Sequence, residues 1–284
     1  RPSGSGYPAP RRDPPPHASA CSMTTPRVVL PSLAAAMDGG FTAIADVSKA
    51  MSLAGAKNDH RLIGGVAVML HIQRLGLDLP LRATGDADFG VPPHVLRRPE
   101  LVQAIEAIGY RKVLGNRWER NLDDRRVAAV DLLVPAYRSR ARDTVKVGDV
   151  VTTEVPGLAE ALRRPGVEIA AELRLTDGSQ LQTNVLLPDA IGTLALKAGA
   201  RTVRNETRDA EDLWRCLEVA AAEGVRPVDF DDPALSGLQQ LLAHELGDGG
   251  SSLPVLTAGL QDEAAARMRT RLRALLAEVV GIAT

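Results

Sequence analysis

The chain has 284 residues, of which 45% are hydrophobic and 24% charged, a balance that suits one large globular domain or two small ones. No apolar run approaches the roughly 18 residues of a membrane span, and two cysteines, Cys21 and Cys216, argue against a disulfide framework or a zinc site. Because no signal peptide is indicated either, we expect a cytoplasmic protein with no membrane partner.

The net charge of −1 argues against a general nucleic-acid coat, but the charge is unevenly distributed. Between Arg97 and Arg142 eleven basic residues stand against six acidic ones, a local net of +5. Between Asp209 and Asp248 two arginines stand against ten acids, a local net of −8. The middle of the chain could therefore hold a polyanion and the C-terminal part could not, unless both stretches are simply solvated faces of opposite sign.

In chain order, residues 1–26 come first and hold seven of the nineteen prolines without a periodic apolar pattern, so we expect a disordered tail. The folded part begins near Leu30. Apolar periodicity, β-propensity and turn residues then predict a helix over 40–55, a strand over 60–63, a helix over 66–75, a strand over 81–91, a helix over 99–108 and a strand over 127–134.

The second part of the chain begins with a predicted hairpin over 168–187, because two β-rich runs flank the turn dipeptide Asp177-Gly178. After Pro188 the pattern is helical to the end. The predicted fold class is therefore mixed α/β (α+β), with a mixed sheet flanked by helices over 30–187 and a helical C-terminal domain over 188–284.

Asp86 and Asp88 lie two residues apart on the predicted strand 81–91, so their side chains point to one face with α-carbons about 6.6 Å apart. A divalent cation removes the repulsion between two such carboxylates, and Mg²⁺ prefers one or two carboxylates together with phosphate oxygens. The pair alone is a weak signal, because a solvated strand end has the same pattern.

Residues around this pair strengthen the interpretation. Gly64 and Gly65 stand between a strand and a helix, where backbone N–H groups can approach a phosphate, although a tight turn would also use a glycine. Arg82 lies four residues before Asp86 and is expected on the same face, either as an ion-pair partner or as a fork for a phosphate. Thr84 is a small residue and leaves room for a ligand to approach the two acids.

A third acid, Asp131, interrupts the apolar run VAAVDLLVP. A buried acid is costly unless it is paired or binds a metal, so the alternatives are an ion pair with an arginine and a metal site. We favour the metal site, because three carboxylates on adjacent strands can hold two divalent ions about 3.5–4 Å apart for displacement at phosphorus.

Together these motifs resemble the DNA polymerase β-like nucleotidyltransferases, and more closely the AbiEii-type toxins, including the mycobacterial MenT group. The resemblance covers about residues 60–217. It rests on G-G-x-A-x-x-x-H, on R-x-T-x-D-x-D, on a lysine in a later helix and on a downstream acidic motif in which arginine replaces the usual lysine. The matching residues are Gly64, Gly65, Ala67, His71, Arg82, Thr84, Asp86, Asp88, Lys197, Arg208, Asp209, Asp212 and Leu213.

The resemblance also implies roles for the later residues. Lys197 projects from the apolar stripe of its predicted helix and could reach a triphosphate, unless it is an ordinary surface lysine. Asp212 would orient Lys197 or contact the nucleotide. His71 is expected to be packed or hydrogen-bonded rather than catalytic. Asp86, Asp88 and Asp131 would bind Mg²⁺ or Mn²⁺.

The activity implied is transfer of a nucleoside monophosphate from an NTP to the 3′ end of tRNA, by a toxin that blocks translation and is paired with an antitoxin protein. The basic stretch between Asp88 and Asp131 is where the tRNA would lie. A second interpretation is modification of a protein hydroxyl or of a small molecule such as an aminoglycoside. A third is an inactive module that only binds a nucleotide or partner, against which the intact acids and lysine argue.

Overall fold

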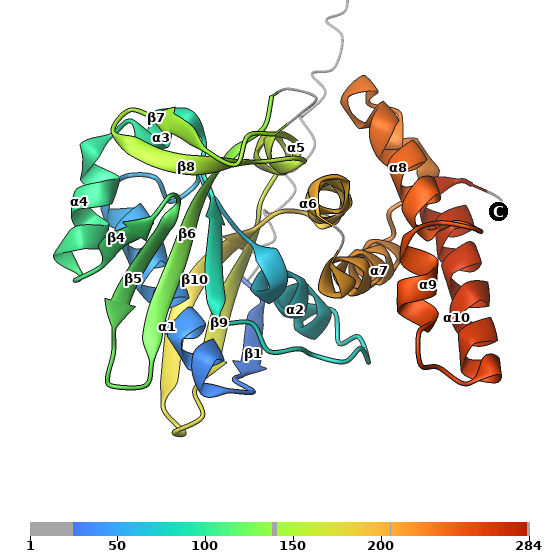
Figure 1. Ribbon diagram of the computed structural model, residues 1–284, viewed down its shortest axis with the longest axis horizontal. Helices are drawn as coiled ribbons and strands as arrows, with labels where there is room; N and C mark the ends of the chain where they lie inside the picture. The colour runs from blue at the N-terminus through green and yellow to red at the C-terminus, as the bar shows by residue number, and fades with distance from the viewer. Residues whose placement is uncertain (1–24, 138–140, 205, 283–284) are drawn as a thin grey trace, which may run out of the picture.

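The computed structural model describes residues 25–137, 141–204 and 206–282. Strands gather in one half of the molecule, and the helices from the last third of the chain form the other half (Figure 1). The predicted mixed α/β class is therefore confirmed. The segment predicted as a disordered tail falls almost entirely outside the described residues. Within them, no helix has the length and apolarity needed to span a bilayer.

Two sheets form the α/β half. In the smaller sheet β9 lies between a parallel β1 and an antiparallel β10; in the larger one the order is β2-β3-β6-β5-β4, and β8 joins the end of β6 and carries β7. The strands are β1 (Arg27–Pro31), β2 (Arg61–Ile63), β3 (Asp86–Gly90), β4 (Arg111–Leu114), β5 (Arg117–Asn121), β6 (Val127–Pro135), β7 (Val145–Val147), β8 (Val150–Val155), β9 (Val167–Arg174) and β10 (Gln180–Leu187).

The central strand β6 follows from its sequence, because a strand buried on both faces needs a nearly continuous apolar run. It pairs in parallel with β3 on one side and antiparallel with β5 on the other, and its predicted position was correct. The predicted hairpin is also confirmed as β9 and β10, with Gly178 in the left-handed conformation at its turn (φ +85°).

Helix α1 (Ala35–Leu53) packs between the two sheets and starts five residues earlier than the predicted helix 40–55. Gly39 and Gly40 lie inside the observed helix, where they permit close packing. A Cβ at Gly39 would lie 2.1 Å from the carbonyl oxygen of Val127 at the start of β6. The helix therefore runs through the glycines and brings its backbone against the larger sheet.

The remaining helices surround the sheets or build the second half. They are α2 (Gly64–Arg74), α3 (Pro93–Leu96), α4 (Pro99–Ala107), α5 (Leu158–Arg163), α6 (Ala190–Val203), α7 (Thr207–Ala222), α8 (Ser236–Leu246), α9 (Ser252–Thr257) and α10 (Asp262–Leu275). Helices α6 to α10 share an apolar core of their own, and Val68 and Ile72 of α2 belong to it. Helix α2 therefore joins the two halves.

The predicted strand 81–91 was too long at its beginning, because β3 starts only at Asp86. Its partner β6 ends its pairing there, with Asp86 opposite Ala129. The preceding residues form an irregular segment that runs toward the helical half, where Arg82 pairs with Asp212 of α7. Arg82 is therefore not on a strand face shared with Asp86, as the sequence suggested.

Candidate functional site

Three carboxylates lie on one face of the larger sheet. The parallel register of β3 and β6 places Asp88 directly opposite Asp131. Asp86 precedes Asp88 by two residues on the same strand and therefore points the same way. The structure thus brings the three predicted acids together at the centre of the sheet.

Arg117 stands against these carboxylates. It lies directly opposite Asp131 in the antiparallel pair of β5 and β6. Its Nη1 donates to Asp86 Oδ1 at 2.9 Å and lies 3.7 Å from Asp131 Oδ2, while its Nε donates to Glu119 Oε1 at 2.7 Å. Sequence reasoning considered an unnamed arginine partner for Asp131; the partner is on the neighbouring strand, where only the strand register could reveal it.

The carboxylates are crowded and poorly solvated. Burial raises the pKa of Asp131 to about 6, with the charge of Asp88 adding to the effect and that of Arg117 opposing it. Burial also raises the pKa of Asp88. Asp131 Oδ1 is buried and has no hydrogen-bond partner in the described part of the chain. An additional cation would therefore be stabilised here.

A cleft of about 360 Å³ opens beside the carboxylates, between the sheet and α6. Asp88 and Asp131 line one wall, and Lys197 and Arg204 of the α6 region line the other. Gly64, at the first residue of α2, lies between them. Cations suited to an anionic ligand thus face acids suited to a divalent cation across one cleft.

Each glycine of the predicted pair makes room for one side chain. Gly64 has a left-handed conformation (φ +76°), and a Cβ there would lie 2.0 Å from Asp88 Oδ2. A Cβ at Gly65 would lie 2.4 Å from an Nη of Arg82. Gly64 lines the cleft, whereas Gly65 packs against Arg82. Of the two glycines predicted to approach a phosphate, only Gly64 is in a position to do so.

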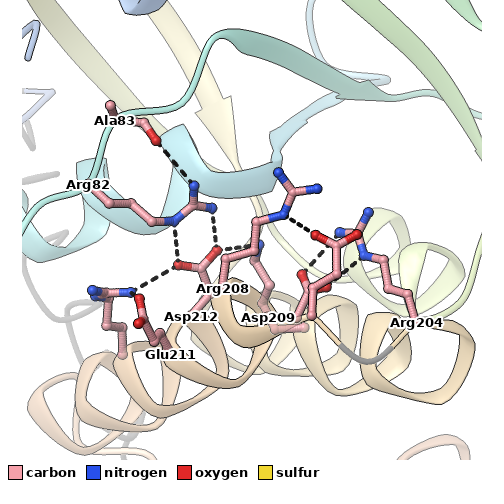
Figure 2. A network of polar contacts seen from close by, with 10 residues as sticks. Arg82, Ala83, Arg204, Arg208, Asp209, Glu211 and Asp212 are labelled. Atoms are coloured by element: carbon pink, nitrogen blue, oxygen red, sulfur yellow. Dashed lines mark hydrogen bonds and ion pairs between the residues drawn. The ribbon is translucent and has the colours of Figure 1, made fainter. Parts of the chain in front are cut away.

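Asp212 accepts hydrogen bonds from three cationic side chains (Figure 2). Arg82 donates to both of its carboxylate oxygens at 3.0 and 2.7 Å, Lys197 Nζ donates at 2.7 Å and Arg215 at 3.3 Å. Burial alone would raise the pKa of Asp212, but Lys197 and Arg82 outweigh it and lower the pKa to about 2. The Arg82 fork is thus engaged with Asp212 rather than directed at the cleft.

Lys197 is 6% exposed, so it is not an ordinary surface lysine. Its ion pair with Asp212 leaves the ammonium at the cleft wall. Of the two roles considered for Asp212, orientation of Lys197 is the one that its contacts support. Thr84, which was expected near the nucleotide, is half-buried in the irregular segment before β3 and does not line the cleft.

Arg204 was not identified from the sequence. It caps the C-terminal end of α6 and forms a bidentate pair with the buried Asp209 of α7, at 2.7 and 3.0 Å. The pair is drawn in Figure 2 next to Arg208, which contacts Glu206. The downstream acidic motif thus contributes one acid to each of the two cations at the cleft.

His71 is fully buried in α2. Its Nε2 bonds the carbonyl oxygen of Pro188 at 2.9 Å, and its Nδ1 lies 3.1 Å from an Nη of Arg74. The prediction that it is a packed, hydrogen-bonded histidine is confirmed. Cys216 is also buried, which agrees with its place in the helical pattern.

In the part of the chain that the structure describes, no group of three or more His, Cys, Asp or Glu side chains has the arrangement of a metal site. At the three carboxylates, the guanidinium of Arg117 contacts Asp86 and approaches Asp131. The donor chemistry nevertheless fits Mg²⁺, which prefers carboxylate oxygens. The unpartnered Asp131 Oδ1 and the space that Gly64 leaves for Asp88 agree with that fit.

No protein-family model matches the chain, and no curated protein matches it.

Proposed function

We propose that the chain is a metal-dependent nucleotidyltransferase, similar to the AbiEii-type toxins, which transfers a nucleoside monophosphate from an NTP to the 3′ end of tRNA and so blocks translation. As such a toxin it would act in the cytoplasm and be held in check by a cognate antitoxin protein. The observation that carries the proposal is that Asp88 and Asp131 line the same cleft as Lys197.

The proposed reaction forms a bond between an acceptor hydroxyl oxygen and the α-phosphorus of the NTP and breaks the bond to the β-phosphate oxygen. Pyrophosphate leaves with the electron pair. Mg²⁺ or Mn²⁺ held by Asp86, Asp88 and Asp131 would neutralise phosphate charge. Asp131 would complete this metal site or help to activate the acceptor hydroxyl by taking its proton.

Lys197 and Arg204 would bind the triphosphate. Both line the cleft, and each forms an ion pair with an acid of α7. A cation fixed before the ligand arrives stabilises developing phosphate charge without having to be ordered during the reaction. Arg82, which pairs with the same acid as Lys197, would act indirectly by fixing Asp212.

An RNA acceptor requires basic residues whose charge is not neutralised by an ion pair with an acid of the same chain. Four arginines of the basic stretch fail this test, because they form ion pairs with acids. They are Arg117 with Asp86, Arg120 with Asp46, Arg126 with Asp123 and Arg142 with Glu154. We therefore restrict the proposed RNA contact to basic residues of the stretch that are not paired with acids.

In the described part of the chain no ion pair is formed by five other basic residues of the stretch, Arg97, Arg98, Arg111, Lys112 and Arg125. Of these we take Arg97, its neighbour Arg98 and Lys112, because Arg97 and Lys112 contact the hairpin of β7 and β8. Lys112 Nζ donates to the carbonyl oxygen of Val151, and the Cα of Arg97 packs next to Gly148 at the hairpin turn. Farther along, β8 reaches the cleft. An RNA backbone along this hairpin would place its 3′ end at the carboxylates.

The test is incubation of the purified protein with each labelled NTP and total RNA, followed by a denaturing gel. We expect label on RNA, and Asp88→Asn should abolish labelling while retaining the cooperative unfolding transition, because it removes a metal-binding charge from the cleft wall. A folded Asp88→Asn variant that labels RNA at the wild-type rate would rule out this site. Label on a protein or a small molecule, with RNA untouched, would replace the acceptor.

A further inference from the structure

The guanidinium of Arg117 lies where a divalent cation would meet the same carboxylates. It donates to Asp86 at 2.9 Å and lies 3.7 Å from Asp131 Oδ2. Two cations that share these oxygens would stand within a few ångströms of each other and would repel strongly, even in a partly solvated site. The guanidinium and a divalent cation would therefore compete for these carboxylates.

We propose that Arg117 is the resident counter-ion of the carboxylate site, and that a divalent cation binds only by displacing its guanidinium from Asp86. The inference rests on the proposed function, since that function requires the metal. In the absence of metal, Arg117 offsets the repulsion among the three acids. On metal binding it withdraws from Asp86.

Arg117 can make this change without being left unpaired. Its Nε is held separately by Glu119, at 2.7 Å, so only the Nη1 contact to Asp86 has to be broken. The side chain is 36% exposed, which leaves it room to turn. Its neighbour Asn116 lines the cleft and accepts from Thr153 Oγ1 at 3.0 Å. The strand therefore stays in place while the side chain moves.

Withdrawal of the Arg117 guanidinium from Asp86 would also link metal binding to nucleotide binding. A guanidinium held by Glu119 would stand next to Asn116, which lines the cleft, and arginine binds phosphate oxygens through a planar fork. The same side chain would thus serve the acids before the metal arrives and the nucleotide afterwards.

The experiment is a titration with Mn²⁺ alone, without nucleotide, in which free Mn²⁺ is followed by electron paramagnetic resonance. It compares wild type, Arg117→Gln and Arg117→Lys. The matched control is Arg126→Gln, which removes an arginine of similar exposure that pairs with Asp123 and Asp177 instead. Asp88→Asn reports whether Mn²⁺ binds at the carboxylates.

We expect Arg117→Gln to bind Mn²⁺ about tenfold more tightly or better than wild type. It should also melt at a lower temperature in EDTA and gain more from Mn²⁺. The lysine variant should be intermediate and Arg126→Gln unchanged in affinity. The lysine variant keeps the positive charge and lacks only the guanidinium fork. It can therefore be compared with wild type even if the glutamine variant does not fold.

Equal or weaker Mn²⁺ binding by Arg117→Gln, with wild-type binding abolished by Asp88→Asn, would overturn the counter-ion role alone. Absence of Mn²⁺ binding in wild type and every variant would overturn both this role and the metal-dependent function.

Discussion

Asp212 is the residue on which the cation side of the cleft depends. One carboxylate, 1% exposed, accepts hydrogen bonds from Arg82, Lys197 and Arg215. Removing a buried acid leaves its cations uncompensated, whereas removing one of several cations leaves the acid paired. The two kinds of substitution should therefore separate stability from function.

Asp212→Asn is expected to lower the free energy of unfolding by about 3–5 kcal/mol, the typical result of breaking a buried ion pair from one side. Lys197→Ala should cost less stability, because Asp212 keeps Arg82 and Arg215. It should nevertheless abolish nucleotidyl transfer while leaving nucleotide-independent RNA binding intact. Urea unfolding measures the stability of each variant, and filter binding measures its affinity for RNA. Equal loss of transfer and RNA binding in Lys197→Ala would place the lysine on the RNA surface instead.

Residue positions were predictable from the sequence where local pattern alone determined them. Strand alternation put Asp86 and Asp88 on one face, and the apolar run put Asp131 on a buried strand. The partners were not predictable. Arg117 meets Asp131 only through the register of β5 on β6, and Arg82 meets Asp212 across 130 positions of sequence. Pairing of this kind is a tertiary property that no local pattern encodes.

At the scale of elements, α2 is held against the helical half by a buried histidine. His71 bonds the carbonyl of Pro188 just before α6, and its neighbour Arg74 pairs with Glu223 at the end of α7. Burial, together with the charge of Arg74, lowers the pKa of His71 to about 3, although the bond to Pro188 opposes the shift. The contact is therefore maintained by a neutral imidazole.

This pKa makes stability depend on pH with a definite sign. Between pH 6.5 and about 3 the unfolded chain binds a proton at His71 that the folded chain does not. Lowering the pH through this window should therefore destabilise the fold by up to about 1.4 kcal/mol per pH unit. His71→Gln should flatten the slope of unfolding free energy between pH 6.5 and 5, and His94→Gln, at an exposed position, should not. Parallel slopes for wild type and His71→Gln would contradict the assignment.

The elements themselves were largely predictable, and the errors occurred where packing overrode local signals. The helix predicted from residue 40 begins at Ala35, and its glycines lie inside it, where the larger sheet approaches closely. Segment 81–85 had the composition of a strand, yet β6 offers it no partner and α7 attracts Arg82. Both departures involve contacts with elements distant in the sequence.

At the scale of the whole molecule, the distribution of charge decides where an acceptor can lie. The sequence predicted a basic region, but it could not show which arginines are neutralised by acids from elsewhere. Arg120 pairs with Asp46 of α1, and Arg126 pairs with Asp123 and Asp177. The local charge of +5 therefore overstates the charge available to a ligand.

The acceptor prediction follows from this distribution. Combined substitution of Arg97, Arg98 and Lys112 by glutamine should weaken tRNA binding and reduce the slope of log affinity against log salt by about 2, since each lost phosphate contact removes about 0.7–0.9. Metal-dependent NTP binding should be unchanged. The control is Arg267→Gln combined with Arg269→Gln, two exposed positions of α10, which should not alter the slope. Periodate-oxidised tRNA should not be labelled, because its 3′ ribose diol is lost. An unchanged salt slope in the triple variant would show that the RNA does not follow the β7–β8 hairpin, and labelling of oxidised tRNA would show that the 3′ end is not the acceptor.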